Sequence, residues 1–429
     1  MTVHLPSGGT EIELLRAVVE RLAPIPRLPT SAGEREAAGL IRGWLADLGA
    51  RAGVEEVPAR RSYAWPVGVL CATGVVAGWA ALRGHRFVGA AGGALAAAGI
   101  VDEITGRRLA DVPARLAEPR QPERPAEPRE PERRVGRRTL TRPRTADNVV
   151  GEVGSPDAER VLVVLAHHDA APSGVVFEQT VQEWLAEHRP AVLERATSNP
   201  PLWWPVIGGP ALVALGSLTG RRGLVRTGLV ASLVALAAMV DIGRRPAVPG
   251  ANDNLSGVAA LVALAARLRA RPVPGLRVLL VSAGAEEALQ EGIRGFAARH
   301  FPGLPTDRTW FVNLDTIGSG RLVLLAGEGP VRMHDYPAGF TGLVARCADA
   351  TGVPLLRGLR SRNSTDGSVP LRHGYPTATV VSVDHRKLIP HYHLDTDLPE
   401  HVDYGCVAGA VRLVEAVARE LVSSRDGQR

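Results

Sequence analysis

The first part of the chain alternates between helix-like and strand-like patterns. Residues 11–49 carry two helical patterns, with apolar residues three and four positions apart in EIELLRAVVERLA. The second helix is predicted to start at Ser31 and to stop at Gly49, and Glu34 follows Ser31 at the spacing of a capping box. The stretch ARAGVEEVPA that follows reads as a strand.

Strand-like apolar runs separated by helical stretches return later in the chain. The helical stretch LVALAARLRA precedes LRVLLVSAG, and the other strand-like runs are NVVGEVG, VLVVLAHHD, TWFVNLD and ATVVSV. Because such alternation is typical of a sheet covered by helices, the sequence predicts an α/β fold.

Four uncharged apolar runs interrupt this α/β pattern. They are residues 65–82, 87–101, 202–218 and 227–240. A short Arg-rich turn joins the members of each pair, so we expect two inserted α-helical hairpins, 65–101 and 202–240. A membrane span needs about 18–20 apolar residues; the first run reaches this length, the third is borderline, and the others need snorkelling arginines. We expect both hairpins to be transmembrane; two buried hairpins packed on the α/β domain are the alternative.

The charge pattern adds a linker and argues against nucleic acid as a partner. The net charge is +6, and Lys387 is the one lysine. The arginines concentrate in residues 107–145, an Arg/Pro/Glu-rich segment that reads as a solvated linker and has no interleaved aromatic residues. The three cysteines (Cys71, Cys347 and Cys406) are far apart, so we predict neither a disulfide framework nor a cysteine zinc site.

The flanking charges give a prediction for the location of the protein. No signal-peptide pattern opens the sequence, and four spans would leave the α/β segments on one side of a membrane. The Arg-rich linker lies on that side, which predicts a cytoplasmic α/β domain in a membrane-associated protein. The turns RGHR and TGRRGLVR are also basic and argue the other way. A soluble cytoplasmic protein is the alternative.

Five stretches place acids and histidines after strands or at helix starts. They are AHHDAAPSG (166–174), GANDNLSG (250–257), SAGAEEAL (282–289), FVNLDTIG (311–318) and YHLDTDLPEHVD (392–403). Each alone has an ordinary interpretation: a structural histidine, a helix N-cap or a solvated acidic face. Together they can meet at one edge of the sheet, because ligands of open α/β sheets bind beyond the carboxyl ends of the strands. Two histidines and three carboxylates suit a pair of zinc ions.

In these five motifs and their order the sequence resembles metallopeptidase family 28, the co-catalytic di-zinc aminopeptidases. The resemblance covers residues 10–64, 146–180 and 249–420 and leaves the hairpins and the linker outside. It implies one discontinuous zinc peptidase domain with a mixed, mostly parallel central β-sheet flanked by helices.

The resemblance also implies the metal ligands. His167 and Asp315 would bind the first zinc, Glu287 and His393 the second, and Asp253 would bridge the two ions.

Further roles are implied for four other residues. Asp169 would orient the His167 ring, Glu286 would act as general base, and Tyr392 would stabilise the oxyanion. Asp366 is a candidate for substrate binding. His168 is expected to be a neighbour of the site rather than a ligand.

The sequence departs from the family pattern in two places. His167 and Asp253 are 86 residues apart where simple members have about a dozen, because the second hairpin intervenes. The last motif has Leu394 where Thr is common; Asp397 rather than Asp395 fits the family position, and His391 offers a competing register.

The function implied is that of a zinc-dependent exopeptidase, an aminopeptidase that hydrolyses N-terminal peptide bonds of a peptide substrate with two Zn²⁺ ions. A carboxypeptidase or a single-zinc cyclase of the same family is an alternative. A non-catalytic membrane receptor or scaffold on a peptidase-like fold is a third reading. The oligomeric state stays open.

Overall fold

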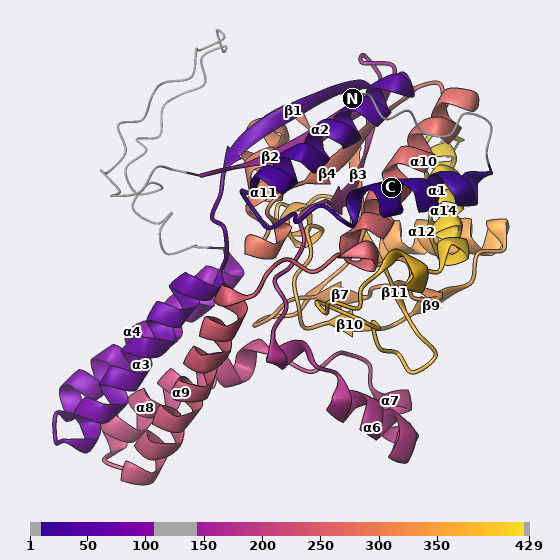
Figure 1. Cartoon of the computed structure of the whole chain (residues 1–429). Coiled ribbons are helices and arrows are strands. Elements are labelled where there is room, and N and C mark those ends of the chain that lie inside the picture. The colour runs from indigo at the N-terminus through magenta and orange to yellow at the C-terminus, as the bar shows by residue number, and fades with distance from the viewer. Residues whose placement is uncertain (1–9, 107–143, 424–429) are drawn as a thin grey trace, which may run out of the picture.

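Eight strands form one central sheet in the computed structural model, which describes residues 10–106 and 144–423 (Figure 1). Across the sheet the strands are β1 (Arg51–Pro58), β2 (Thr145–Gly154), β4 (Leu276–Ala283), β3 (Arg160–His167), β5 (Thr309–Leu314), β11 (Thr377–Val383), β6 (Arg321–Leu324) and β9 (Leu355–Arg357). β3, β4, β5 and β11 are parallel, and β6 pairs antiparallel to β11. A small second sheet contains β10 (Arg360–Ser361), β7 (Gly327–Glu328) and β8 (His334–Asp335).

Helices cover both faces of the central sheet. One face packs against α1 (Glu11–Leu22), α2 (Ala32–Asp47), α10 (Ser256–Ala270), α12 (Ala338–Thr351) and α14 (Tyr404–Ser423). The other packs against α11 (Glu291–His300), next to α13 (Ser368–Arg372). Short helical turns are η1 (Val175–Phe177), η2 (Ala251–Leu255), η3 (Glu286–Ala288), η4 (Phe301–Gly303) and η5 (Pro399–His401). The predicted mixed, mostly parallel α/β sheet flanked by helices is confirmed.

The start of α2 differs in one detail from its prediction. Ser31 is the N-cap and accepts a hydrogen bond from the Glu34 amide at 3.1 Å. The Glu34 carboxylate does not complete the capping box, because it accepts from the amides of Thr30 and Ala285, each at 2.9 Å. A residue that looked like part of a local cap therefore joins α2 to the turn that follows β4.

The two predicted hairpins assemble into one four-helix bundle. They consist of α3 (Ala64–Leu82) with α4 (Arg86–Thr105), and of α8 (Trp203–Thr219) with α9 (Arg222–Arg244). The bundle projects from the α/β body, with the two turns at its far end (Figure 1). The hairpins thus pack on each other instead of lying separately on the α/β domain. α3, α4 and α9 are longer than their uncharged runs, whereas α8 has the same length as its run.

Glycines allow the bundle helices to approach closely. A Cβ atom added at Gly209 of α8 would lie 2.8 Å from the backbone nitrogen of Ser232 on α9. One added at Gly93 of α4 would lie 2.7 Å from the carbonyl oxygen of Pro210 on α8. Such contacts are too short for a side chain, so these glycines set the interhelical spacing by their size.

Three of the four bundle helices are long and apolar enough to cross a membrane. α3 has 19 residues, α4 has 20 and α9 has 23, whereas α8 has only 17. Their apolar windows are only 39%, 33% and 28% buried within the protein. α4 and α9 reach this length because the helices continue through charged residues at their ends, as the snorkelling argument requires.

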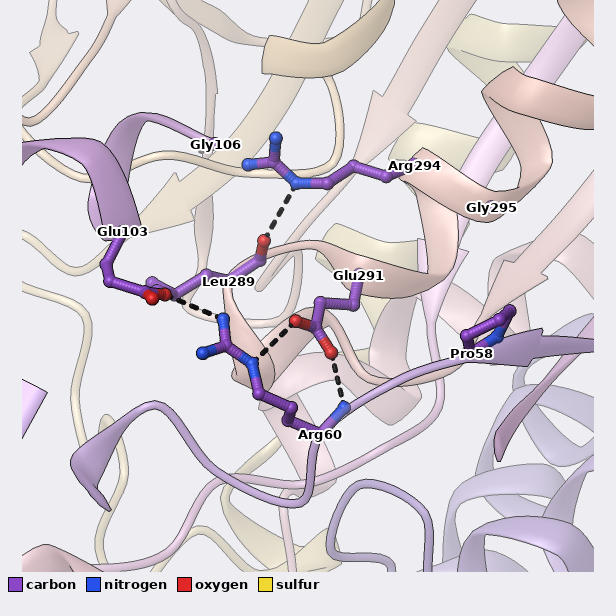
Figure 2. A pocket seen from close by; sticks show the side chains of 8 residues that line it. All are labelled: Pro58, Arg60, Glu103, Gly106, Leu289, Glu291, Arg294 and Gly295. Atoms are coloured by element: carbon purple, nitrogen blue, oxygen red, sulfur yellow. Dashed lines mark hydrogen bonds and ion pairs between the residues drawn. The ribbon is translucent and has the colours of Figure 1, made fainter. Parts of the chain in front are cut away.

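An ion-pair network fixes the base of the bundle to the α/β body (Figure 2). The Arg60 guanidinium contacts Glu103 of α4 at 2.7 Å and Glu291 of α11 at 2.9 Å, and the Arg60 amide also donates to Glu291. Arg294 donates from its Nε to the carbonyl of Leu289 at 3.1 Å. Most of the predicted linker 107–145 lies outside the described residues; Arg144 precedes β2, and Thr145, predicted as the end of the linker, is the first residue of that strand.

We expect Gly209→Ala to destabilise the bundle and Gly208→Ala to leave it intact. Both substitutions remove a glycine from the same turn of α8, but a Cβ at Gly208 has no atom within 4 Å. The overpacked variant should lose about 1–3 kcal/mol of stability. Thermal unfolding followed by helical circular dichroism measures the difference, and equal melting temperatures for the two variants would contradict the packing argument.

Candidate metal centre

The acidic and histidine motifs meet at the carboxyl edge of the sheet. His167 ends β3, the Glu286–Glu287 pair forms η3 after β4, and Asp315 follows β5 directly. Because these three strands are parallel and adjacent, their ends lie side by side. Asp253 comes from η2, at the start of α10, across the same edge.

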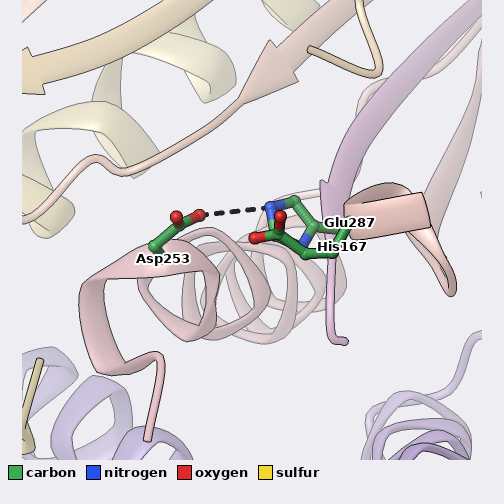
Figure 3. A group of neighbouring side chains, drawn as sticks. All are labelled: His167, Asp253 and Glu287. Atoms are coloured by element: carbon green, nitrogen blue, oxygen red, sulfur yellow. Dashed lines mark ion pairs between the residues drawn. The ribbon is translucent and has the colours of Figure 1, made fainter. Parts of the chain in front are cut away.

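Asp253 lies between two histidines. Its Oδ1 is 3.3 Å from His167 Nε2, and its Oδ2 is 3.2 Å from His393 Nε2. Glu287 Oε1 lies 3.2 Å from the same His393 nitrogen. His167, Asp253 and Glu287 each offer a ligand atom within 4.8 Å of the others (Figure 3). The structure therefore brings four of the five predicted ligands into direct proximity.

Two buried carboxylates hold the backbone of this cluster. Asp169 accepts from the amides of Glu286 and Glu287, each at 3.0 Å, and its Oδ1 lies 3.5 Å from His167 Nδ1. Asp397 accepts from the amides of Asn252 and Asp253, at 2.8 and 3.0 Å.

Arg27 is a supporting residue that sequence reasoning missed. Its side chain is fully buried and donates to the carbonyls of His168 at 2.8 Å and Pro249 at 2.7 Å. Burial lowers the pKa of Arg27 to about 10, against the opposing charges of Asp169 and Asp397. The segment IPRLPT gave no signal, because these partners lie far along the sequence.

Burial and mutual repulsion disturb the carboxyl groups of the cluster. Burial raises the pKa of Asp315 to about 7, helped by the charges of Asp253 and Glu287. It also raises the pKa of Glu286 well above its usual value, with Glu287 adding to the shift. Asp253 is the exception: although burial opposes it, the contacts with His167 and His393 lower its pKa.

These residues line one end of a cavity of about 540 Å³. His167, Asp253, Glu286, Glu287, Asp315 and Tyr392 all face it. The Tyr392 ring stacks on His393, with centroids 4.0 Å apart, and the Phe177 ring contacts the imidazole in an edge-to-face arrangement with centroids 4.4 Å apart. Tyr392 is therefore placed beside the cluster, and Phe177, which was not predicted, fixes the His393 ring.

Two other histidines of the motifs lie outside the cluster. His168 points to the opposite side of its strand, where its Nδ1 lies 2.9 Å from Ser282 Oγ, and burial lowers its pKa to about 4. His391 stacks on His401 with centroids 4.3 Å apart. The geometry thus agrees with the choice of His393 over His391 in the last motif.

Asp366 lies near the cluster but does not line the cavity. Its side chain is buried, and neither carboxylate oxygen has a hydrogen-bond partner among the described residues. Burial raises its pKa to about 8, with Asp169 and Asp315 contributing. Its predicted role in substrate binding stays a prediction.

The donor set fits zinc. Imidazole nitrogens and carboxylate oxygens without thiolates are ligands that Zn²⁺ accepts. Asp253 Oδ2 and both His393 ring nitrogens are buried without a hydrogen bond of good geometry among the described residues. Since buried polar atoms are normally satisfied, these atoms are available for a cation that would also offset the carboxylate repulsion.

Comparison with solved structures identifies the fold as that of zinc exopeptidases. A leucine aminopeptidase precursor from Bacteroides thetaiotaomicron is 14% identical, with a TM-score of 0.52 and coverage of 97% of this chain and 99% of that chain. A glutaminyl cyclase from Tannerella forsythia is 14% identical, with a TM-score of 0.53 over 96% and 99% of the two chains. The zinc aminopeptidase BSAP from Bacillus subtilis is 15% identical, with a TM-score of 0.53 over 97% and 96%.

A family model matches part of the sequence. The model of peptidase family M28 matches residues 233–418, which confirms the resemblance to metallopeptidase family 28. The match includes Asp253, Glu286, Glu287, Asp315 and His393. It begins at residue 233 and therefore does not include His167. Comparison with curated proteins found no match.

We expect Asp397→Asn to weaken zinc binding by about 10–100-fold without unfolding the protein. Asparagine keeps one acceptor oxygen, so the amide of Asn252 or Asp253 would face an NH₂ group and the Asp253 carboxylate would shift. Titration against a competing chelator measures the affinity. Asp395→Asn, at an exposed position two residues away, is the matched control and should bind zinc normally. Equal affinities in both variants would show that Asp397 does not position the site.

Proposed function

We propose that this chain is a zinc-dependent exopeptidase of the aminopeptidase type that holds two Zn²⁺ ions. The family match supports a peptidase-type enzyme. The aminopeptidase relatives in fold favour removal of N-terminal residues from peptides.

The observation that carries this proposal is the position of Asp253. Its two carboxylate oxygens face different histidines, Oδ1 toward His167 and Oδ2 toward His393. A carboxylate placed in this way can bridge two cations. His167 and Asp315 would hold one ion, and Glu287 and His393 the other.

The residues around the cluster have separate tasks in the proposed reaction. When bound, zinc would supply a water of lowered pKa and polarise the substrate carbonyl. Glu286 takes the proton of the attacking water and delivers it to the leaving amine. The Tyr392 hydroxyl donates a hydrogen bond to the developing oxyanion. Gln290 Nε2 holds Glu286 by donating to its Oε1 at 3.1 Å, and Asp169 fixes the turn from behind.

A single-zinc cyclase is the second candidate. Two observations favour it: glutaminyl cyclases share the fold, and one compact set of three ligand atoms comes from His167, Asp253 and Glu287. The short contacts of His393 with Asp253 and Glu287 favour the two-ion site. A carboxypeptidase would use the same metal centre as the aminopeptidase and would differ in the end of the peptide that it recognises.

The bundle is proposed to anchor the protein in a membrane. Most large apolar side chains that are exposed in the described residues lie on its four helices. Trp65 and Trp204, at the end of the bundle near the body, are about half exposed. Trp79, close to the far turn, is also about half exposed. Tryptophan is enriched at both membrane interfaces. The helical rise from Trp65 to Arg83 is about 27 Å, close to the thickness of a bilayer core.

The proposed orientation places the α/β body in the cytoplasm. It rests on the Arg-rich segment between the hairpins, which would stay on the side of the body. Arg83 and Arg86 at the far turn would then lie outside the cytoplasm. Cysteine labelling can distinguish this orientation from the opposite one, in which the α/β body lies outside.

Glu286→Gln should retain zinc and lower kcat by about 10²–10⁴-fold, because the amide cannot take the water proton. His167→Ala should instead lose zinc. Hydrolysis of aminoacyl-p-nitroanilides gives the rate, and elemental analysis of purified protein gives the zinc content.

Each outcome separates the candidate functions. Near-normal turnover of Glu286→Gln would refute the general-base role. One zinc per chain with ammonia release from N-terminal glutamine would identify a cyclase. Bound zinc without turnover of either substrate class or of carboxypeptidase substrates would favour the non-catalytic receptor or scaffold.

The membrane proposal predicts extraction by detergent and retention in the membrane at high salt. In cells, an impermeant maleimide should label His85→Cys at the far turn, and Asp157→Cys on the body should stay unlabelled. Both positions are exposed. Release by salt alone would refute insertion, and the reverse labelling pattern would place the α/β body outside.

A further inference from the structure

Residues 175–202 form a cap beside the candidate metal centre. The segment contains η1, α6 (Thr180–His188) and α7 (Pro190–Arg195), and it leads into α8. The part after residue 180 falls in the extra length between His167 and Asp253, outside the region that resembles the family. It therefore has to be explained from its own contacts.

Hydrogen bonds fasten this cap at both ends. At its start, Gln179 Nε2 donates to the carbonyl of Ile389 at 2.7 Å. At its end, the Arg360 amide donates to the carbonyl of Thr197 at 2.8 Å. The Lys387 ammonium reaches the carbonyl of Glu194 at 2.6 Å. The cap is thus held across the loop after β11 and the β10 strand.

Between the cap and the sheet lies the mostly aliphatic part of the 540 Å³ cavity, whose lining also includes Arg360, Arg362 and Lys387. The cap contributes Leu185, Val192, Leu193 and Leu202 to its roof. Its floor is the face of β6 and β11 away from the main core, with Val323, Leu325, Val381 and Val383. The aromatic residues that line it, Phe177 and Tyr392, lie at the end with the metal ligands.

The size of the cavity exceeds the needs of one side chain. Pockets of about 300–1,000 Å³ enclose whole drug-sized ligands. The aliphatic walls are continuous with the carboxylates of Glu286 and Asp315 within a single cavity. A substrate group bound against these walls would therefore lie next, along the same molecule, to the amide bond that faces the candidate metal centre.

We propose that this cavity selects substrates in which an extended aliphatic group adjoins the amide bond to be cleaved. The group is either a run of aliphatic side chains in a peptide or an acyl chain, which share the same chemistry. The cap is the specificity-determining element, and the base of the bundle beside it would bring such apolar substrates from the membrane surface. The cleavage of the amide bond in this inference rests on the proposed function, whereas the binding of an aliphatic group does not.

The test measures binding to the full-length Glu286→Gln protein in detergent, by calorimetry, with zinc and with chelator. The probes are Leu-Leu-Leu, Ala-Ala-Ala and octanoyl-alanine. We expect Leu-Leu-Leu, octanoyl-alanine or both to bind at least about tenfold more tightly than Ala-Ala-Ala. The reason is that one added methylene group in an apolar pocket already changes the discrimination between ligands by about that factor. Tight binding of Leu-Leu-Leu alone would identify a peptide as the source, and of octanoyl-alanine an acyl chain.

Two substitutions on the same short helix test the cap. Leu185→Gln places an amide in the cavity and should remove the preference, whereas Val181→Gln, 68% exposed and outside the cavity, should keep it. Val381→Thr changes the floor at constant shape, should weaken the preference, and serves if the Leu185 variant does not fold. Equal binding of all three probes, or a preference that survives both cavity substitutions, would overturn the inference.

The proposed function can fail separately. A chain with intact Glu286 that binds the aliphatic probes but cleaves no peptide would refute the exopeptidase and leave the aliphatic cavity standing. Peptide cleavage without any preference for aliphatic probes would support the exopeptidase and refute the aliphatic cavity.

Discussion

Several carboxylates are buried together at one edge of the sheet, and the side chains around them are arranged to accommodate their charge. Asp253, Glu286, Glu287 and Asp315 are all less than a tenth exposed, where like charges repel strongly. The two histidines between them compensate part of this charge, and the buried Arg27 offsets that of the supporting carboxylates Asp169 and Asp397. The remaining donor atoms fit a divalent cation, so the same arrangement that costs stability creates the proposed metal site.

The helical bundle is connected to this edge by apolar contacts rather than by the chain alone. Phe177, which packs on His393, also joins the cluster of side chains at the base of the bundle. Tyr63, the N-cap residue of α3, packs edge to face on Trp203 of α8 in that cluster, with centroids 5.5 Å apart. A bundle anchored in a membrane would therefore hold the metal centre close to the membrane surface, beside the aliphatic cavity.

Much of the fold was predictable because its elements have strong local patterns. The apolar periodicity of α1, the continuous apolar runs of β3 and β4, and the uncharged runs of the four bundle helices all gave elements of the correct type. The assembly of two hairpins into one bundle was not predictable, because it depends on close approach at glycines such as Gly93 and Gly209. α4 and α9 also extended well beyond their uncharged runs, since charged residues continue the same backbone hydrogen bonding.

Local sequence specifies the donor types, the order of the motifs and their positions at strand ends, because strand polarity places such residues at one edge. Tertiary structure alone decided which neighbours face the site: His167 inward and His168 outward, and Glu34 on a distant turn instead of its own cap. It also recruited Arg27 and folded the cap over an aliphatic cavity. These choices depend on contacts between residues more than eighty positions apart, which no local pattern records.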